Sequence, residues 1–223
     1  ISLYPGETAT FPKLPTGTTY TVTEKQYDGY AATEKSEGTV SKEQDGTEIK
    51  LEYLNKWKSG ALEVTKTLGG PAAAGEEITF VITLDFSEAD LLKSDATVEQ
   101  LADWVEAKDS DGMKVDLEKV DGDDNKYTVT VTKEVEKTDE AVTLASLTKI
   151  PVGTKYTVAE VVKTDVYDYN AEGYEVLYSR NSGELKQIEA KDYTEDGKAS
   201  TGEFTIEEDK QVDTVAITNF RAA

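Results

Sequence analysis

The chain has 223 residues, of which 45 are Asp or Glu and 24 are Lys or Arg, so its formal charge is −21 at pH 7. It contains neither Cys nor His, which excludes disulfides, thiolate or imidazole metal sites, and nucleophile pairs of the Ser-His or Cys-His kind. Nucleic-acid phosphates and anionic membrane surfaces repel so negative a chain, so we expect no nucleic-acid partner and no membrane insertion of this segment.

An internal repeat indicates two related units. The segment 14–24 (LPTGTTYTVTE) returns as the segment 150–160 (IPVGTKYTVAE), and such repeats indicate duplicated structural units. Each copy is followed by a final predicted strand that ends in Asn, at Asn55 and at Asn219. The copies therefore mark equivalent parts of two units.

The unit boundaries follow from where the two copies lie. We expect the first unit at residues 1–57, a linker at 58–60 and the second unit at 61–223. The first unit begins close to its copy of the repeat, so we expect it to be the C-terminal part of a domain whose opening strands are missing. The chain opens with Ile1 rather than Met, which fits an excised piece of a longer protein.

Both units are predicted to be mostly β. Runs of Thr, Val, Ile and Tyr alternate with polar residues and stop at Gly, Asp or Asn, which is typical of short antiparallel strands in a sandwich. Examples are residues 79–84, 127–131, 154–162 and 215–219. One segment differs, because apolar residues at helical spacing follow Thr97, a candidate N-cap. We expect one short helix there, in an insertion at about 87–109.

Three strands of the second unit place a polar side chain on their inward face. Alternate residues of a strand share a face. By this count Lys66, Glu160 and Asn219 each lie on the apolar side of their own strand. The apolar residues that set the count are Leu62, Val64, Tyr156, Val158, Val215 and Ile217.

These three residue types can form a crosslink. Burial disfavours charge, so it favours a neutral amine on Lys66 and a neutral acid on Glu160. A neutral amine is a nucleophile, and a protonated carboxyl can polarise the amide of Asn219 and pass a proton to departing ammonia. The product is a Lys-Asn isopeptide bond. The alternation of faces along each strand also allows an alternative. In it the three residues sit at strand ends, the Lys66 side chain reaches water, and Glu160 merely pairs with Lys66.

The motifs around these residues resemble those of isopeptide-forming domains in Gram-positive pilins and surface adhesins. The match covers the whole second unit, and the motifs are Val64-Thr-Lys66, Tyr156-Thr-Val-Ala-Glu160 and Ile217-Thr-Asn219. The resemblance implies tandem immunoglobulin-like antiparallel sandwiches of the reversed, collagen-adhesin B type. It also implies that Lys66 and Asn219 form the crosslink and that Glu160 is the catalytic proton shuttle. The helical insertion departs from the smallest members of the family.

The first unit carries only part of this set. Glu24 and Asn55 are its equivalents of the second unit's Glu and Asn, and each shares parity with apolar neighbours. No preceding strand supplies a Lys, and Lys13 is a poor substitute because it precedes the repeat turn rather than lying on an opening strand. We expect upstream residues to supply the strand and its Lys, with a neighbouring molecule as the alternative.

Other acidic motifs are interpreted as turns or as solvated surface. The segment 121–125 (DGDDN) begins like a calcium loop but lacks the required Gly and the closing Glu, and 109–112 (DSDG) lacks an earlier ligand. A glycosidase needs two carboxylates in one cleft, and the sequence singles out no such pair. We therefore expect no metal, no cofactor and no enzyme activity beyond a single autocatalytic crosslink.

The sequence thus favours a structural protein of the Gram-positive cell surface, a pilin backbone or adhesin stalk stabilised by the crosslink. As the resemblance implies, its partners would be neighbouring pilin subunits or surface-protein domains joined through sortase. The protein would be extracellular and anchored to the cell wall by a signal outside this segment. The rival hypothesis is an adhesive or carbohydrate-binding module of a cell-wall-anchored protein, which contacts a host matrix protein or glycan. Trp57 and Trp104 offer it a sugar platform, although such residues more often cover a linker or seat a helix.

Overall fold

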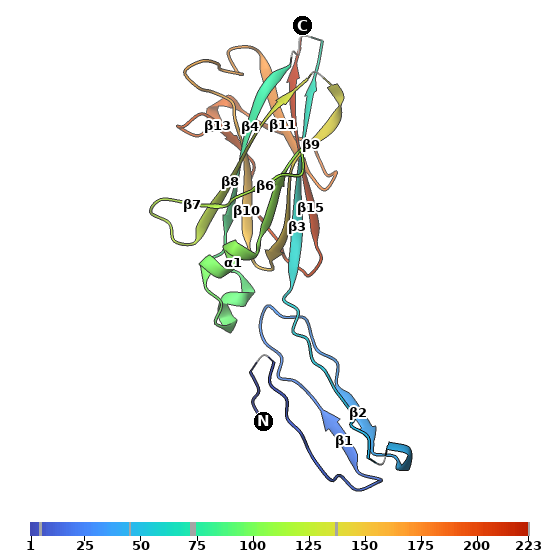
Figure 1. The fold of residues 1–223 in the computed structure, drawn as a ribbon. Coiled ribbons are helices and arrows are strands. Elements are labelled where there is room, and N and C mark those ends of the chain that lie inside the picture. Colours follow the sequence, from blue (N-terminus) through green and yellow to red (C-terminus); the bar gives the residue numbers. More distant parts are fainter. Residues whose placement is uncertain (5, 45, 72–74, 137, 223) are drawn as a thin grey trace.

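The computed structural model describes residues 1–4, 6–44, 46–71, 75–136 and 138–222. Residues from 59 onward form two sheets that pack face to face, and residues 1–57 form a narrow extension at one end of them (Figure 1). The expected fold class, a mostly β chain with sandwich-like sheets and one α-helix, is confirmed.

The first sheet carries the strand of Glu160. Its order is β13-β10-β4-β8-β7, β14 also pairs with β10, and every pair in it is antiparallel. The strands are β4 Glu76–Asp85, β7 Glu118–Lys119, β8 Lys126–Val135, β10 Lys155–Val161, β13 Lys198–Ser200 and β14 Phe204–Thr205.

The second sheet carries Lys66 and Asn219. Its order is β12-β11-β15-β3-β9-β5-β6. The strands are β3 Ser59–Gly69, β5 Glu106–Asp109, β6 Lys114–Val115, β9 Thr138–Pro151, β11 Tyr174–Arg180, β12 Lys186–Ile188 and β15 Val212–Arg221. At its centre β15 and β3 run parallel, whereas the other pairs are antiparallel. The first strand of the second unit is therefore hydrogen-bonded to its last strand.

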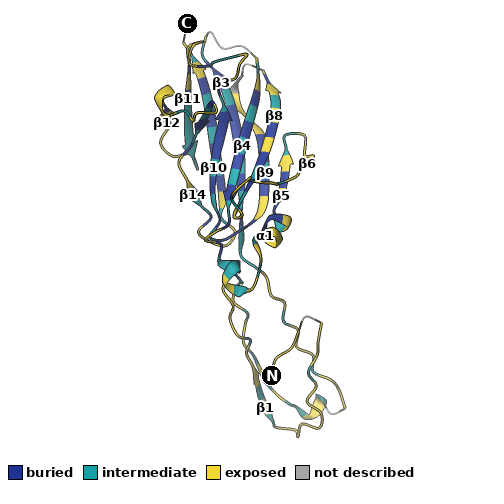
Figure 2. Cartoon of the chain, turned by 90° about the vertical axis from the view of Figure 1, so that its left-hand side faces the viewer, coloured by how far each residue is buried: buried dark blue, intermediate teal, exposed yellow. Residues whose placement is uncertain are grey.

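The core lies between the two sheets. On β4 inward residues alternate with outward ones, and Phe80, Ile82 and Leu84 are fully buried. Leu62 and Val64 of β3 belong to the same core. Figure 2 shows buried residues running along β3, β4 and β10. Removing these apolar faces from water is the main stabilising contribution to such a sandwich.

The first unit is thinner than a sandwich. It contains one antiparallel pair, β1 (Thr19–Val22) with β2 (Ser36–Thr39), followed by a 3-10 turn at Lys42–Gln44. Among the described residues of 1–57, only Gly29 is buried. Within that range the unit therefore encloses no apolar core of its own.

The predicted helix is α1, Val98–Trp104, and its predicted cap is confirmed. The Thr97 hydroxyl accepts a hydrogen bond from the Gln100 backbone N–H, and the Gln100 side chain accepts one from the Thr97 N–H. This capping box satisfies two donors at the helix start. The remaining short helices are 3-10 turns at Asp90–Ser94 and Ala190–Asp192.

The two units meet at the helical insertion. The rings of Trp57 and Trp104 stack with their centroids 5.4 Å apart. Gly29, whose φ is +77°, lies so close to Leu91 that a Cβ at this position would come within 2.7 Å of that side chain. Only a glycine fits both the backbone angle and the close approach. Both tryptophans are thus used in packing between the units.

Candidate functional site

Three strands bring Lys66, Glu160 and Asn219 to one place in the core. In the parallel pair of β3 and β15, Lys66 is opposite Ile217 and Leu68 is opposite Asn219. Lys66 and Asn219 therefore leave the second sheet on the same face, two positions apart in register. Glu160 comes from β10 of the first sheet, so the site joins both layers.

The carboxylate of Glu160 bridges the amine and the amide. Lys66 Nζ lies 2.7 Å from Glu160 Oε2, and Asn219 Nδ2 donates to Glu160 Oε1 at 2.8 Å. All three residues are 0% exposed. The strand-end alternative expected Lys66 to reach water and to pair with Glu160. The ion pair is present, but Lys66 does not reach water.

Burial controls the protonation of Lys66. Desolvation of its ammonium outweighs the attraction and the hydrogen bond of Glu160, so the pKa of Lys66 is lowered from 10.5 to about 8. The ring of Phe80, with its centroid 5.7 Å from Nζ, forms part of the apolar wall around the amine. The lowered pKa reduces the free energy needed to reach the neutral, nucleophilic amine.

Asn219 has one polar atom that no group satisfies. Its Oδ1 is buried and has no hydrogen-bond partner among the described residues, an arrangement that costs free energy. Turning the amide by half a turn would place Oδ1 beside Glu160, where a protonated carboxyl donates to it. That hydrogen bond would polarise the carbonyl and make its carbon a better electrophile.

The first unit brings Glu24 and Asn55 together in the same way. Asn55 Nδ2 donates to Glu24 Oε1 at 2.8 Å. Asn55 is exposed and Glu24 is half-buried, so this pair lies at the surface. Across the described residues, no Lys makes an ion pair with Glu24. The sequence predicted both residues to face inward on strands, the second on a strand ending at Asn55, but β1 ends at Val22, residues 47–56 belong to no strand and Asn55 is exposed.

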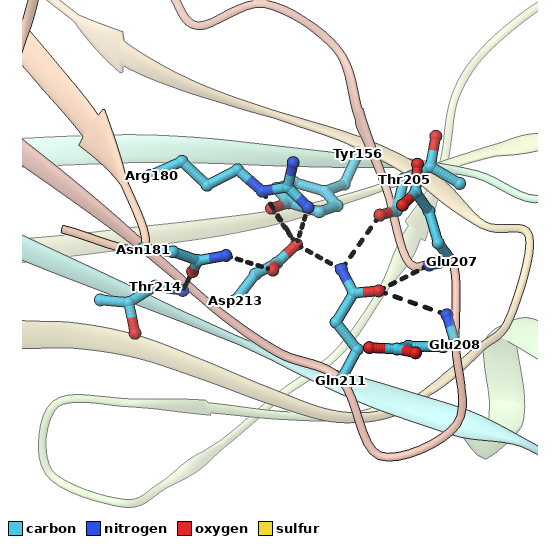
Figure 3. A network of polar contacts seen from close by, with 9 residues as sticks. All are labelled: Tyr156, Arg180, Asn181, Thr205, Glu207, Glu208, Gln211, Asp213 and Thr214. Atoms are coloured by element: carbon cyan, nitrogen blue, oxygen red, sulfur yellow. Dashed lines mark hydrogen bonds and ion pairs between the residues drawn. The ribbon is translucent and has the colours of Figure 1, made fainter. Parts of the chain in front are cut away.

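Sequence reasoning missed a second buried polar group, Asp213 at the start of β15 (Figure 3). Its carboxylate accepts hydrogen bonds from Tyr156 at 2.6 Å, Arg180 at 2.9 Å, Asn181 at 2.9 Å and Gln211 at 3.0 Å. Asp213 is fully buried. The network joins the start of β15 to β10 and to the end of β11.

Parity could have found this group too. Asp213 lies on the same face of β15 as Asn219, separated from it by the buried Val215 and Ile217. It is at the opposite end of the strand from Asn219, so it holds the fold together rather than taking part in the crosslinking chemistry.

We expect Asp213→Ala to lower the free energy of unfolding by about 3 kcal/mol, because it leaves Arg180 and Tyr156 without their buried partner. Burial alone raises the pKa of Asp213, but hydrogen bonds from Asn181, Tyr156 and Arg180 outweigh it and hold the pKa below its ordinary value. The carboxylate therefore stabilises the fold above about pH 4 and loses this effect as the pH falls through its lowered pKa.

Urea unfolding from pH 7 down to pH 3 checks this expectation. The control is Asp116→Ala, whose carboxylate makes an exposed ion pair with Lys114. We expect the control to match the wild type at every pH. Equal stability of the Asp213→Ala variant and the control at pH 7 would contradict the structural role of the network.

The acidic motifs considered for calcium form turns. Asp123 Oδ1 accepts from the Asn125 N–H, and Asp109 Oδ1 accepts from the N–H groups of Asp111 and Met113. Within the described ranges, no group of three or more acidic side chains is placed to hold a metal ion. None of the helices described is both long enough and apolar enough to cross a membrane.

Comparisons with known proteins give the following similarities. A family model described as a domain of unknown function (DUF7601) matches residues 1–56, and no curated protein matches the chain. Similar solved structures include the major pilin of Streptococcus pyogenes, with 19% identity, a TM-score of 0.41, and coverage of 96% of this chain and 73% of that one.

Two further similar structures are also pilus proteins. The major pilin T3.2 of Streptococcus pyogenes has 19% identity and a TM-score of 0.43, and 95% of this chain and 69% of that one are covered. The pilus-presented adhesin Spy0125 has 20% identity and a TM-score of 0.38, and 74% of this chain and 27% of that one are covered.

Proposed function

We propose that Lys66 and Asn219 are joined by an intramolecular isopeptide bond and that Glu160 is the proton shuttle for its formation. This proposal rests on one group of buried contacts, between Lys66, Glu160 and Asn219. The amine and the amide come from the first and last strands of the second unit, and one carboxylate bridges them at 2.7 and 2.8 Å. Exclusion of water favours the neutral groups that the reaction requires.

The reaction balances within the site. The neutral amine of Lys66 attacks Cγ of Asn219, a C–N bond forms, and the bond from Cγ to Nδ2 breaks. Glu160 takes a proton from the attacking amine and gives one to the departing nitrogen, which leaves as ammonia. The carboxylic acid is regenerated, but the amine and amide are consumed. Each chain therefore reacts once, and the protein is not an enzyme in the sense of repeated turnover.

The proposed biological role is a structural one. The sandwich would be a segment of a shaft on the surface of a Gram-positive cell, either a pilin backbone or an adhesin stalk. Its partners would be neighbouring subunits or surface domains joined through sortase, and an anchor outside this segment would hold it to the cell wall. A covalent link between terminal strands suits this role because it restrains the domain against unfolding and proteolysis.

Intact mass spectrometry tests the bond directly. We expect the folded chain to weigh less than its sequence by one ammonia, and Glu160→Ala to remove this loss because the proton shuttle is absent. Glu63→Ala is the matched control. Glu63 lies on the same strand as Lys66 but on the outer face of the sheet, where it accepts a hydrogen bond from the Thr143 hydroxyl. An unmodified wild-type mass, or full crosslinking in Glu160→Ala, would refute the proposal.

The lowered pKa of Lys66 gives a second expectation, for an uncrosslinked variant. In Asn219→Ala the amine stays titratable, and between pH 8 and pH 10.5 the unfolded chain keeps a proton that the folded chain releases. Stability therefore rises with pH in this range, by about 3 kcal/mol at most for a shift from 10.5 to about 8.

The crosslinked wild type should lack this rise, because the nitrogen of Lys66 is then an amide and does not titrate. Urea unfolding of both proteins at pH 8 and pH 10 measures the difference, since the other titrating groups are common to both. Parallel pH profiles would mean either that the fold does not lower the pKa of Lys66 in the variant or that the wild type is not crosslinked, and the intact mass separates these two cases.

A further inference from the structure

The proposed crosslink lies close to one end of the second unit's core. On β10 only one residue follows Glu160, and on β15 only two follow Asn219. Val176 of β11 is opposite Asn219 and lies two residues after the start of its strand. Charged side chains near strand ends ordinarily reach water. Lys66, Glu160 and Asn219 are nevertheless 0% exposed, so another part of the chain covers this end.

The cover is the connection between β10 and β11, residues 162–173. Its residue Tyr169 is 1% exposed and belongs to the core. The Tyr169 N–H donates to the Val162 carbonyl at 2.9 Å, and the Tyr169 carbonyl accepts from the Tyr174 N–H at 2.9 Å. Val162 is two residues beyond Glu160 and, like Tyr174, is buried. The two hydrogen bonds therefore hold Tyr169 between the end of β10 and the start of β11.

Further aromatic rings pack around Tyr169. Its ring contacts those of Tyr167 and Tyr174, with centroids 5.0 and 5.3 Å away, and the Tyr167 hydroxyl donates to the Val161 carbonyl at 3.1 Å. Burial raises the pKa of Tyr169, and the negative charge of Glu160 raises it further, which fits a carboxylate close to the ring. The ring cluster therefore shields the carboxylate from water at this end of the core.

We infer that residues 162–173 are a lid over the crosslinking site and that Tyr169 is the positioning residue that seals it. This inference rests on the proposed Lys66-Asn219 reaction and adds the step that sets its rate. The bond forms only after the connection has packed onto the end of the core. Pairing of the strands, which brings the three side chains together, is not sufficient by itself.

The lid acts on the position of one proton. While the end of the core is open, water stabilises the ammonium of Lys66 and the carboxylate of Glu160, and an ammonium is not a nucleophile. Closure removes that water and favours transfer of the proton from Lys66 Nζ to Glu160 Oε2. The transfer gives the amine and the carboxylic acid that the reaction uses. No proton is exchanged with solvent in this step, so the lid acts by excluding water.

Pulse-labelled cell-free synthesis of the full chain measures the rate of crosslinking. Samples are quenched in acid at intervals, and intact mass gives the fraction that has lost one ammonia. We expect Tyr169→Phe, which keeps the ring, to react at the wild-type rate. Tyr169→Ala opens the end of the core and should slow the reaction by about 10-fold or more. If Tyr169→Ala does not become trypsin-resistant, Tyr169→Gln replaces it, since a polar side chain admits water with a smaller loss of volume.

Tyr127→Ala is the matched control. Tyr127 is a buried tyrosine on β8, opposite Leu84, which lies four residues along β4 from Phe80, the partner of Glu160. This substitution removes an equal side chain farther from the lid, so crosslinking should keep the wild-type rate once the chain resists trypsin. A folded Tyr169→Ala variant that reacts at the wild-type rate, or an equal slowing in Tyr127→Ala, would overturn the lid. Both outcomes leave the wild type's loss of ammonia in place, whereas a wild type without that loss would refute the crosslink itself.

Discussion

Asn219→Ala is expected to lower the free energy of unfolding by about 5 kcal/mol, because it removes a crosslink that closes a loop from residue 66 to residue 219. A link over so long a loop restricts the unfolded chain strongly in the loop-entropy description. For a domain of this size the loss corresponds to a fall in melting temperature of about 10 to 20 °C. The variant keeps the Lys66-Glu160 ion pair, so it does not leave an unpaired buried charge.

Thermal unfolding and the rate of trypsin digestion measure this effect. Thr218→Ala is the matched control, because Thr218 is next to Asn219 on β15 and lies on the outward, half-buried side. We expect the control to change stability by about 0.5 kcal/mol or less. An Asn219→Ala variant with the melting temperature and trypsin resistance of the wild type would contradict a stabilising crosslink.

The inward polar residues of the second unit could be predicted because a strand has a strict period of two. Once the apolar residues of β3, β10 and β15 fix the parity, Lys66, Glu160 and Asn219 can only point inward. The repeat then pairs Glu24 with Glu160 and Asn55 with Asn219. Asp213 obeys the same rule, but the strand predicted at residues 215–219 starts one inward position later and does not include it.

What periodicity could not supply was contact between strands. The spacing of apolar residues within β3 and β15 does not predict that the two strands are parallel neighbours in register. That pairing depends on how the whole chain folds back. The unsatisfied oxygens of Asn219 and Glu24 were equally out of reach, since they depend on distances between side chains. The role of Trp57 and Trp104 was also decided by packing, because the stacked pair lies where the two units meet.

The parallel pairing of β3 and β15 determines how the second unit would carry tension. Tension that passes along the chain enters this unit near Ser59 at the start of β3 and leaves near Arg221 at the end of β15 (Figure 1). These two strands are adjacent, so a bond from Lys66 to Asn219 would pass the load directly from one to the other. The residues between these two positions would then carry no tension, whatever the strength of their hydrogen bonds.

Single-molecule stretching of the chain between its two ends should therefore separate the wild type from Asn219→Ala. In the variant, unfolding of the second unit releases the segment between residues 66 and 219, about 500 Å of contour at about 3.4 Å a residue. In the crosslinked wild type this step should be absent at forces that leave covalent bonds intact. Extension of the first unit is common to both proteins and serves as the internal reference. A step of about 500 Å in wild-type molecules of the crosslinked mass would show that the bond does not lie in the path of the load.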